Sequence, residues 1–268
     1  MVVDADPFAS IFRERVHVIA GLFRDNGLAQ GGGSLQRPRP VVEYGGGDGT
    51  GVLRRRTSHN TAFRISAGDQ IVSDTLPDAI LDQLFRTARS YNGYLDKPVS
   101  PAQLRAIWDL MKFGPTSANS LPARIVWCVT DAARDRLAGL VSPGNAAKVR
   151  SAPVTAIIGM DHAFYELLPE LLPHADARSW FAGNDELART TAFRNSSLQG
   201  GYFILAARAL GLDTGPMSGF DHDAVDAAFF ADQPGVKSNF IATLGYGDPA
   251  SIFERSPRPD FERFNRIA

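Results

Sequence analysis

The stretch FGPTSANSLPARIVWCV, Phe113–Val129, joins an expected helix to an expected buried strand. Apolar residues at helical spacing over 101–112 lead into Gly114-Pro115, which cannot continue a helix. Short polar residues follow, and an apolar run of strand length then covers 124–130. The polar residues are Thr116, Ser117, Asn119 and Ser120. This arrangement would bring several hydrogen-bonding side chains to one sheet edge, where a planar polar cofactor could be held. An ordinary helix–strand connection would use the same residues, and this segment taken alone favours that simpler interpretation.

Apolar periodicity along the rest of the chain predicts a mixture of helices and strands. Helical spacing appears over 77–90, 101–112, 131–140, 162–171, 185–211 and 222–230. Ser100-Pro101 is suited to cap the second of these helices. Runs of strand length occur over 124–130, 154–160 and 238–246, with a short fourth near 212–215. Long helices with few strands indicate an α+β or α/β fold.

Composition excludes several classes of protein. The chain has 268 residues, 44% of them hydrophobic, which suffices for one domain, or for one domain with an extension. The net charge of −1 gives no electrostatic reason to expect nucleic acid or an anionic membrane as a partner. The one cysteine, Cys128, lies in an apolar strand pattern and is expected to be a buried thiol. No apolar run is long enough to span a bilayer and the start MVVDADPF lacks signal-peptide features, so we expect a cytoplasmic location.

Residues 1–75 differ in composition from the rest of the chain. They contain two runs of three glycines, an Arg-Pro alternation over 37–40 and no lysine. Only Phe8–Phe23 has apolar residues at helical spacing. We therefore expect a low-complexity or loosely ordered extension before a folded domain over 76–268. The triplet Arg54–Arg56 would suit either an anion patch or a solvated run of charges, and the sequence also allows that translation starts downstream of this extension.

Three further tracts accompany the first one: ARSYNGYLDKPVSPAQL (Ala88–Leu104), GNAAKVRSAPVTAIIG (Gly144–Gly159) and LGLDTGPMSGFD (Leu210–Asp221). In this order and spacing, the chain resembles the flavin-dependent nitroreductase family over roughly residues 79–265. The tracts Pro173–Phe181 and Ala192–Asp221 are similar to the branch that contains the malonic semialdehyde reductases. The resemblance implies a nitroreductase-like α+β sandwich, in which helices flank a mixed, mainly antiparallel sheet. It also implies FMN as cofactor, NADH or NADPH as co-substrate, and an intertwined homodimer.

The resemblance assigns one group of residues to the FMN phosphate. Arg89, Ser90 and Asn92 match the family's phosphate segment, although the family usually has Arg or Lys where this chain has Asn92. Near the C-terminus, Arg255 and Arg258 stand in a basic stretch similar to the one that completes the phosphate site. A dianionic phosphate requires Arg or Lys together with hydroxyl and backbone donors. The sequence does not decide between Arg255 and Arg258, and a solvent-facing role stays open for each.

Two other groups are expected around the flavin ring and ribityl chain. One is the turn that contributes Pro115, Thr116, Ser117 and Asn119, from the subunit opposite the one that contributes Arg89–Asn92. The other is the pair Asn145 and Lys148, which share one face if their stretch is helical. They match a family Asn-x-x-Lys, in which the amide meets the ribityl chain or ring edge and the ammonium approaches N1/O2. A fixed cation there stabilises the reduced, anionic ring. The alternative is an exposed helix lysine.

The segment Gly215–Gly219 contains two glycines and a proline, and is expected to form a tight turn that presents backbone N–H groups. In the family this loop lies against the flavin, with a backbone N–H directed at N5. The resemblance therefore assigns Pro216, Met217, Ser218 and Gly219 to the cofactor. Ser218 stands where many members have an acidic residue, so only the backbone role carries over.

On the substrate side, the resemblance points to Arg178, Trp180 and Phe181, in the tract that covers the open face of the flavin. Arg178 would hold a small carboxylate, such as that of malonic semialdehyde, by paired hydrogen bonds. Trp180 and Phe181 would serve equally well as packing residues.

The activity implied is FMN-dependent oxidoreduction in two half-reactions, in which NAD(P)H delivers hydride to flavin N5 and a small acceptor then takes the electrons. No side chain is assigned a catalytic role of its own. The first substrate expected is malonic semialdehyde, reduced to 3-hydroxypropionate in pyrimidine degradation. A general nitroreductase or quinone reductase and a flavin-binding protein without turnover are the alternatives. No GxGxxG follows a strand, the five histidines lack HExxH or CxxC patterns, and no GxSxG occurs, so a Rossmann domain, a metal site and a hydrolase elbow are not expected.

Overall fold

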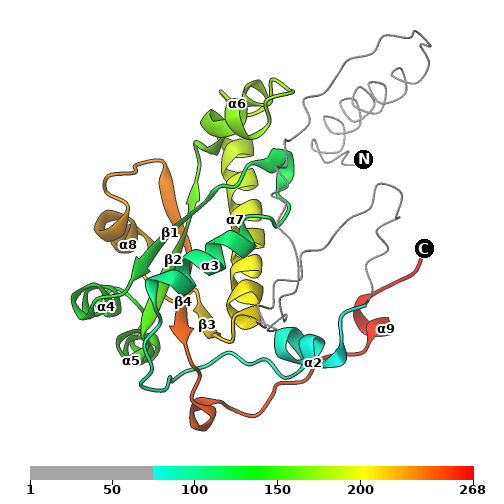
Figure 1. Ribbon diagram of the computed structural model, residues 1–268. Coiled ribbons are helices and arrows are strands. Elements are labelled where there is room, and N and C mark those ends of the chain that lie inside the picture. Colours follow the sequence, from blue (N-terminus) through cyan, green and yellow to red (C-terminus); the bar gives the residue numbers. More distant parts are fainter. Residues whose placement is uncertain (1–74) are drawn as a thin grey trace, which may run out of the picture. The chain divides into compact units, whose positions relative to one another are not determined.

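An antiparallel sheet between two layers of helices forms the described part of the chain (Figure 1). The computed structural model describes residues 75–268. The expected extension over 1–75 lies outside the described residues, apart from Thr75. Within 75–268, no helix is long and apolar enough to cross a bilayer.

Four strands make up the sheet, in the order β1-β2-β4-β3. They are β1 (Ala123–Cys128), β2 (Val154–Asp161), β3 (Asp213–Met217) and β4 (Val236–Gly245). Every neighbouring pair is antiparallel. Outside the strands, Ser90 forms an isolated parallel bridge with Thr214 at the edge strand β3. The expected α+β fold with a mainly antiparallel sheet is therefore confirmed.

Helices α3 (Pro101–Met111) and α7 (Asp185–Ala209) pack on one face of the sheet. A capping box starts α3: the Ser100 hydroxyl accepts from the Gln103 backbone, and the Gln103 side chain accepts from the Ser100 backbone. Ser100-Pro101 thus caps this helix as the sequence predicts. The core on this face includes Ile107, Phe203, Ile158 and Leu244, none of which is exposed.

The other face of the sheet is covered by α4 (Asp131–Ala138), α5 (Pro143–Ser151) and α8 (His222–Phe229). Their buried side chains meet Ile157 and Ile241 from the two central strands. Cys128 belongs to this cluster and is 1% exposed. The expectation of a buried thiol is therefore confirmed, and burial raises the pKa of this thiol to about 11.

A third apolar cluster surrounds the first turns of α7. It joins η3 (Phe164–Leu167), α6 (Leu168–Leu171) and η4 (Arg178–Trp180) through Phe164, Leu168 and Phe181. The other short elements are α2 (Asp78–Leu81), the π-helical turn η1 (Asp82–Arg86), η2 (Ser117–Asn119), η5 (Pro249–Ser251) and α9 (Phe261–Phe264).

Most helices and strands lie where the sequence predicts. The stretch 162–171 forms the two short elements η3 and α6 instead of one helix, and α5 is not among the expected helices. Two further differences concern the edge of the sheet. The helix expected over 77–90 ends at Arg86, because the chain then turns to follow the edge of β3. The strand expected over 212–215 continues to Met217, because it pairs with β4 along its whole length. The second difference changes the expected site.

Candidate functional site

The 88–92 segment, which the sequence assigns to phosphate binding, runs along the outer edge of β3. The Tyr91 backbone N–H donates to the Thr214 carbonyl over 3.1 Å, next to the bridge between Ser90 and Thr214. Gly215 makes this approach possible, because a Cβ at that position would lie 2.4 Å from the Tyr91 carbonyl oxygen. The 88–92 segment and β3 therefore form one continuous surface.

The 251–258 segment lies against the 88–92 segment, and an arginine of each segment donates a hydrogen bond to a backbone carbonyl of the other. Arg89 donates to the Phe253 carbonyl, and Arg255 Nη2 donates to the Ala88 carbonyl over 2.8 Å. Arg258 instead donates to carbonyls of its own neighbours, 256 and 257. The structure thus places Arg255, and not Arg258, against the 88–92 segment.

Asn92 joins the same contact, since its Nδ2 donates to the Ser251 carbonyl over 3.3 Å. Neither Arg89 nor Arg255 forms an ion pair with a carboxylate of the described residues. Arg89 and Arg255 are thus each bonded to a backbone carbonyl, in segments that also carry Ser90 and Asn92. That donor set suits a dianionic phosphate.

Two partly buried charged residues, Arg208 and Asp213, lie near this surface. Arg208 Nη1 donates to the Leu84 carbonyl over 2.8 Å, which fixes the approach to the 88–92 segment. Burial lowers the pKa of Arg208, while Asp213 raises it and Arg255 lowers it further. Burial raises the pKa of the Asp213 carboxyl. The Gly247 N–H, which donates to this carboxylate, and the charge of Arg208 both lower that pKa, but by less. Sequence reasoning missed both residues, because a single arginine at the end of an apolar helix gives no pattern.

The tight turn expected over Gly215–Gly219 is wrong for its first three residues. Gly215, Pro216 and Met217 belong to β3 and pair with Thr243, Ala242 and Ile241 of β4. Proline is tolerated there because β3 is an edge strand, where one row of backbone groups has no strand partner. Only Ser218 and Gly219 lie beyond the strand.

Helix α5 is attached to this end of β3. Asn145 Nδ2 and the Ser142 backbone N–H each donate to the Gly219 carbonyl over 2.9 Å. An open hollow of about 510 Å³ lies beside this contact and is lined by 139–142 and 220–221. The structure thus brings Asn145 and Gly219 together.

Lys148 shares the α5 helix with Asn145, three residues further on, so the expected common face is present. The side chain is partly buried, and burial lowers the pKa of its ammonium. The chain has three other lysines: Lys112 pairs with Asp109, Lys237 pairs with Asp226, and Lys97 lies over the Tyr246 ring. Among residues 75–268, Lys148 alone of the four forms neither an ion pair nor a cation–π contact.

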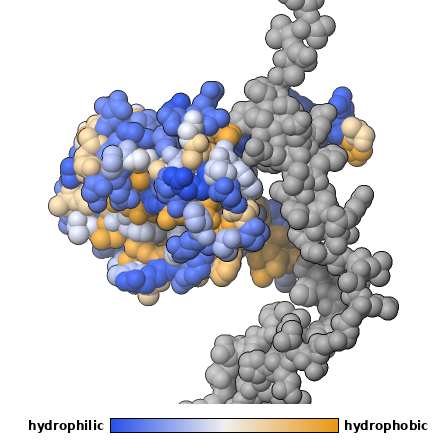
Figure 2. Space-filling model, turned by 90° about the horizontal axis from the view of Figure 1, so that it is seen from above, coloured by the Kyte–Doolittle hydropathy of each residue, from blue (hydrophilic) through white to orange (hydrophobic). Residues whose placement is uncertain are grey.

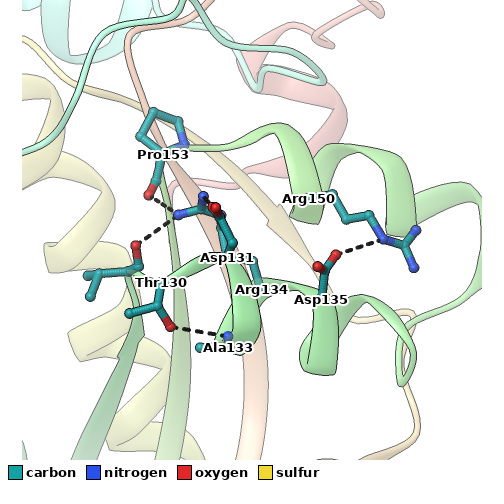
Figure 3. Close-up of polar contacts among 8 residues, drawn as sticks. Thr130, Asp131, Ala133, Arg134, Asp135, Arg150 and Pro153 are labelled. Carbon is teal, nitrogen blue, oxygen red and sulfur yellow. Dashed lines mark hydrogen bonds and ion pairs between the residues drawn. The ribbon is translucent and has the colours of Figure 1, made fainter.

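Polar contacts fix the position of α5 relative to α4 and the sheet (Figure 3). Arg150 Nε lies 3.2 Å from the Asp135 carboxylate, which joins the two helices. Arg134 Nη1 donates to the Val129 carbonyl over 2.9 Å and to the Pro153 carbonyl over 2.8 Å. Arg134 therefore ties the start of α4 to the chain that leaves α5.

The other expected cofactor segment, Pro115–Asn119, lies at the opposite edge of the sheet, because it leads into β1. The Ser117 backbone N–H donates to Asn195 Oδ1 over 2.8 Å, and Asn119 Nδ2 donates to the Leu171 carbonyl over 2.8 Å. Thr116 Oγ1 accepts from the Leu121 N–H over 3.2 Å. Three strand spacings, about 14 Å, separate the two sheet edges. One protomer therefore does not bring all of the expected residues to one place.

The expected substrate residues are engaged in other contacts. Arg178 donates through Nε and Nη2 to both carboxylate oxygens of Glu166, over 2.7 and 2.8 Å, so its planar fork is already filled. This pairing lowers the pKa of Glu166. Phe181 is 7% exposed and packs edge-on against Phe164, and Trp180 packs on the same cluster. In the structure, Phe181 and Trp180 are packing residues, which is the alternative that the sequence left open.

Groups of three or more histidine, cysteine or acidic side chains that could hold a metal ion do not occur within the described range.

Comparison with known proteins gives one consistent result. The model of the nitroreductase family matches residues 85–247. A protein of Burkholderia lata, provisionally named NADH dehydrogenase/NAD(P)H nitroreductase, is 63% identical over 193 residues, covering 72% of this chain and 98% of the relative. A protein of Polynucleobacter asymbioticus with the same provisional name is 55% identical over 196 residues, covering 73% of this chain and 100% of the relative.

Solved structures agree in fold. A Bacillus subtilis protein provisionally described as the nitroreductase ydfN is 22% identical with a TM-score of 0.66, over 72% of this chain and 100% of that one. An Exiguobacterium sibiricum protein, provisionally described as a nitroreductase and solved in complex with FMN, is 17% identical with a TM-score of 0.63, over 73% and 99% of the two chains.

Proposed function

The chain belongs to the nitroreductase family, and we propose that it is an NAD(P)H-dependent oxidoreductase with FMN as its cofactor. The provisional names of the relatives at 55% and 63% identity include NAD(P)H nitroreductase, and a structural relative was solved with FMN. When bound, FMN supplies hydride chemistry between NAD(P)H and an electron acceptor. A cytoplasmic location, where both nicotinamide cofactors are at hand, is part of the proposal.

The observation that carries the proposal is Lys148, a partly buried cation without an anionic partner within 75–268. Burial of a charge without a partner costs free energy, so such a group is typical of a place where a ligand supplies the opposite charge. Lys148 shares a helix face with Asn145, whose amide is bonded to Gly219. A flavin ring held against Ser218 and Gly219 would therefore have this cation within reach.

We infer that Arg89 and Arg255 hold the phosphate, with Ser90 and Asn92 as further donors. Each guanidinium donates only to a backbone carbonyl among the described residues, so each keeps unused donors for phosphate oxygens. Arg258 is the weaker candidate, because it bonds within its own segment.

We further infer that a second copy of the chain completes the site. The 115–119 segment precedes β1 at one sheet edge, whereas the other expected residues lie along β3 at the opposite edge. Large apolar side chains are exposed and available to pack against that copy, among them Phe113 and Phe193, which are 81% and 56% exposed. Figure 2 shows apolar patches among the polar surface of the molecule. A homodimer with two FMN sites at the interface would bring the two segments together.

For the acceptor, we propose electron-poor small molecules such as nitroaromatics and quinones. Arg178 supports this choice, because its Nε and Nη2 already donate to Glu166 and so do not form a pair of free donors for a substrate carboxylate. Malonic semialdehyde, reduced to 3-hydroxypropionate, is the second candidate and is favoured by the tract Pro173–Phe181. It would require the substrate to displace Glu166, whose side chain is 51% exposed.

The visible spectrum of the purified protein tests the cofactor, and anaerobic addition of NADH or NADPH tests the activity. We expect flavin peaks that bleach on addition of the nicotinamide cofactor. Turnover with a nitroaromatic, a quinone and malonic semialdehyde then separates the two candidate functions. Flavin that does not bleach would indicate a binding protein without turnover. A protein that neither carries nor takes up FMN would overturn the proposal.

A further inference from the structure

Three polar side chains of α7 reach the backbone of the segment that leads into β1. Asn195 Oδ1 accepts from the Ser117 N–H over 2.8 Å, and Asn195 Nδ2 donates to the Thr191 carbonyl over 2.8 Å. Gln199 Oε1 accepts from the Ala123 N–H over 2.8 Å. Asn195 and Gln199 are fully buried. The contact of Gln199 with Ala123 is therefore buried, whereas that of Asn195 is partly buried, because Ser117 lies at the surface.

The third side chain, Tyr202, holds the start of the same segment. Its hydroxyl donates to the Pro115 carbonyl over 2.9 Å. Its ring packs so closely on Gly114 that a Cβ there would lie 2.1 Å from a ring carbon. Pro115, Ser117 and Ala123 are thus each held by a different residue on successive turns of one helix.

The segment that these residues hold has an unfavourable backbone conformation. Ala118, Asn119 and Leu121 have φ angles of 54°, 51° and 41°, in the left-handed region where glycine is usual. A plain connection between a helix and a strand would place glycine at such positions. Non-glycine residues persist there only where their surroundings determine the conformation, and such positions are concentrated at ligand-binding sites.

We propose that Asn195 is a positioning residue for the cofactor: it fixes the Ser117 backbone, and with it Pro115–Asn119, in the conformation that meets FMN. The inference rests on the proposed function, because it takes this segment as part of the flavin site completed by the second copy. Asn195 suits the task because one amide both accepts from the segment and donates to the helix. It cannot rotate without losing one of these bonds.

The experiment compares Asn195→Leu, which has a similar shape and no hydrogen-bonding atoms, with Ser196→Ala. Ser196 is the next residue of α7 and equally buried, but bonds to Phe193 and Asn239 instead of the segment. The dissociation constant for FMN is measured by flavin fluorescence, and exchange of the Ser117 amide is measured by mass spectrometry without FMN. We expect Asn195→Leu to weaken FMN binding about tenfold or more and to speed amide exchange over 116–121, with Ser196→Ala near wild type in both.

Equal affinity of Asn195→Leu and wild type for FMN would overturn the inference while the proposed function stands. Wild-type protein that fails to bind FMN would instead overturn the proposed function. If Asn195→Leu does not fold, Asn195→Asp decides, and unchanged affinity of that variant at neutral pH refutes the inference. Tyr202→Phe removes only the hydroxyl that donates to Pro115 and is expected to weaken binding by a smaller factor. Asn195→Asp keeps the acceptor for Ser117 and should recover affinity as the pH falls, because the neutral carboxyl can again donate to Thr191. A merely structural role for Asn195 predicts no such recovery.

Discussion

Replacement of Lys148 by methionine separates a functional lysine from a structural one. Methionine has a similar length and no charge, so Lys148→Met removes the ammonium with little change in the volume packed against α5. The folded state loses a partly buried cation that has no partner within 75–268. We therefore expect the FMN-free variant to be at least as stable as wild type. The FMN-bound variant should lose the counter-charge of the reduced ring and have a lower midpoint potential.

The magnitude follows from the partial burial of the side chain. Two unit charges at ~4 Å interact by roughly 4 kcal/mol at an effective dielectric constant near 20, before desolvation is subtracted. Screening by solvent around this partly buried side chain leaves about 1–2 kcal/mol. For a two-electron couple this corresponds to a midpoint potential lower by about 20–40 mV. Reduction by NAD(P)H should slow accordingly.

The lowered pKa of Lys148 also gives a pH dependence whose sign is fixed. Between its pKa in the folded protein and the ordinary value of 10.5, the unfolded chain binds more protons than the folded one. Stability of wild type should therefore gain a contribution as the pH rises through this window. Below it, both states are protonated and the cost of the buried charge is present in full. Lys148→Met lacks this contribution. The thermal unfolding midpoints of FMN-free wild type and FMN-free Lys148→Met should therefore differ least at high pH.

Potentiometric titration of the bound flavin is the deciding assay, with Lys112→Met as the matched control. Lys112 is also a helix-terminal lysine, but it pairs with Asp109 and lies outside the expected site. We expect no change of potential in the control beyond experimental error. An unchanged potential in Lys148→Met would place its ammonium in solvent and remove it from the site.

Four further outcomes are expected. The FMN-loaded protein should sediment as a dimer, and a flavin-loaded monomer would contradict the split of the site between two sheet edges. A chain that begins near Asp74 should retain FMN binding and activity, since relatives matched over 98–100% of their own length cover only 72–73% of this chain; a folded but flavin-free product would refute this. Gly215→Ala should weaken FMN binding strongly in an equilibrium titration, because its Cβ would lie 2.4 Å from the Tyr91 carbonyl and displace the 88–92 segment. The Cys128 thiol should resist a disulfide reagent at neutral pH until the protein unfolds, because its pKa is about 11 and the thiolate forms only as the pH approaches that value; rapid reaction in the native state would show that β1 opens.

The sequence by itself determined the order and kind of the main elements. The apolar periodicity of a helix or a strand depends only on residues that are close together in the chain. For this reason α3, α7, β2 and β4 lie where the pattern predicts them. Ser100 caps α3 and Cys128 is buried for the same reason, since each outcome depends on near neighbours in the chain. The resemblance to the nitroreductase family was also available from short tracts in order.

The tertiary structure alone decided which side chains are engaged and which are free. Gly215–Met217 looks like a turn in sequence, but forms an edge strand because β4 offers a partner and the Tyr91 carbonyl leaves no room for a side chain. Arg178 looks like an anion site, but Glu166 fills its fork. Asn195, which holds the strained segment before β1, gave no signal at all. These outcomes depend on contacts between residues far apart in the chain, and only the folded backbone sets those distances.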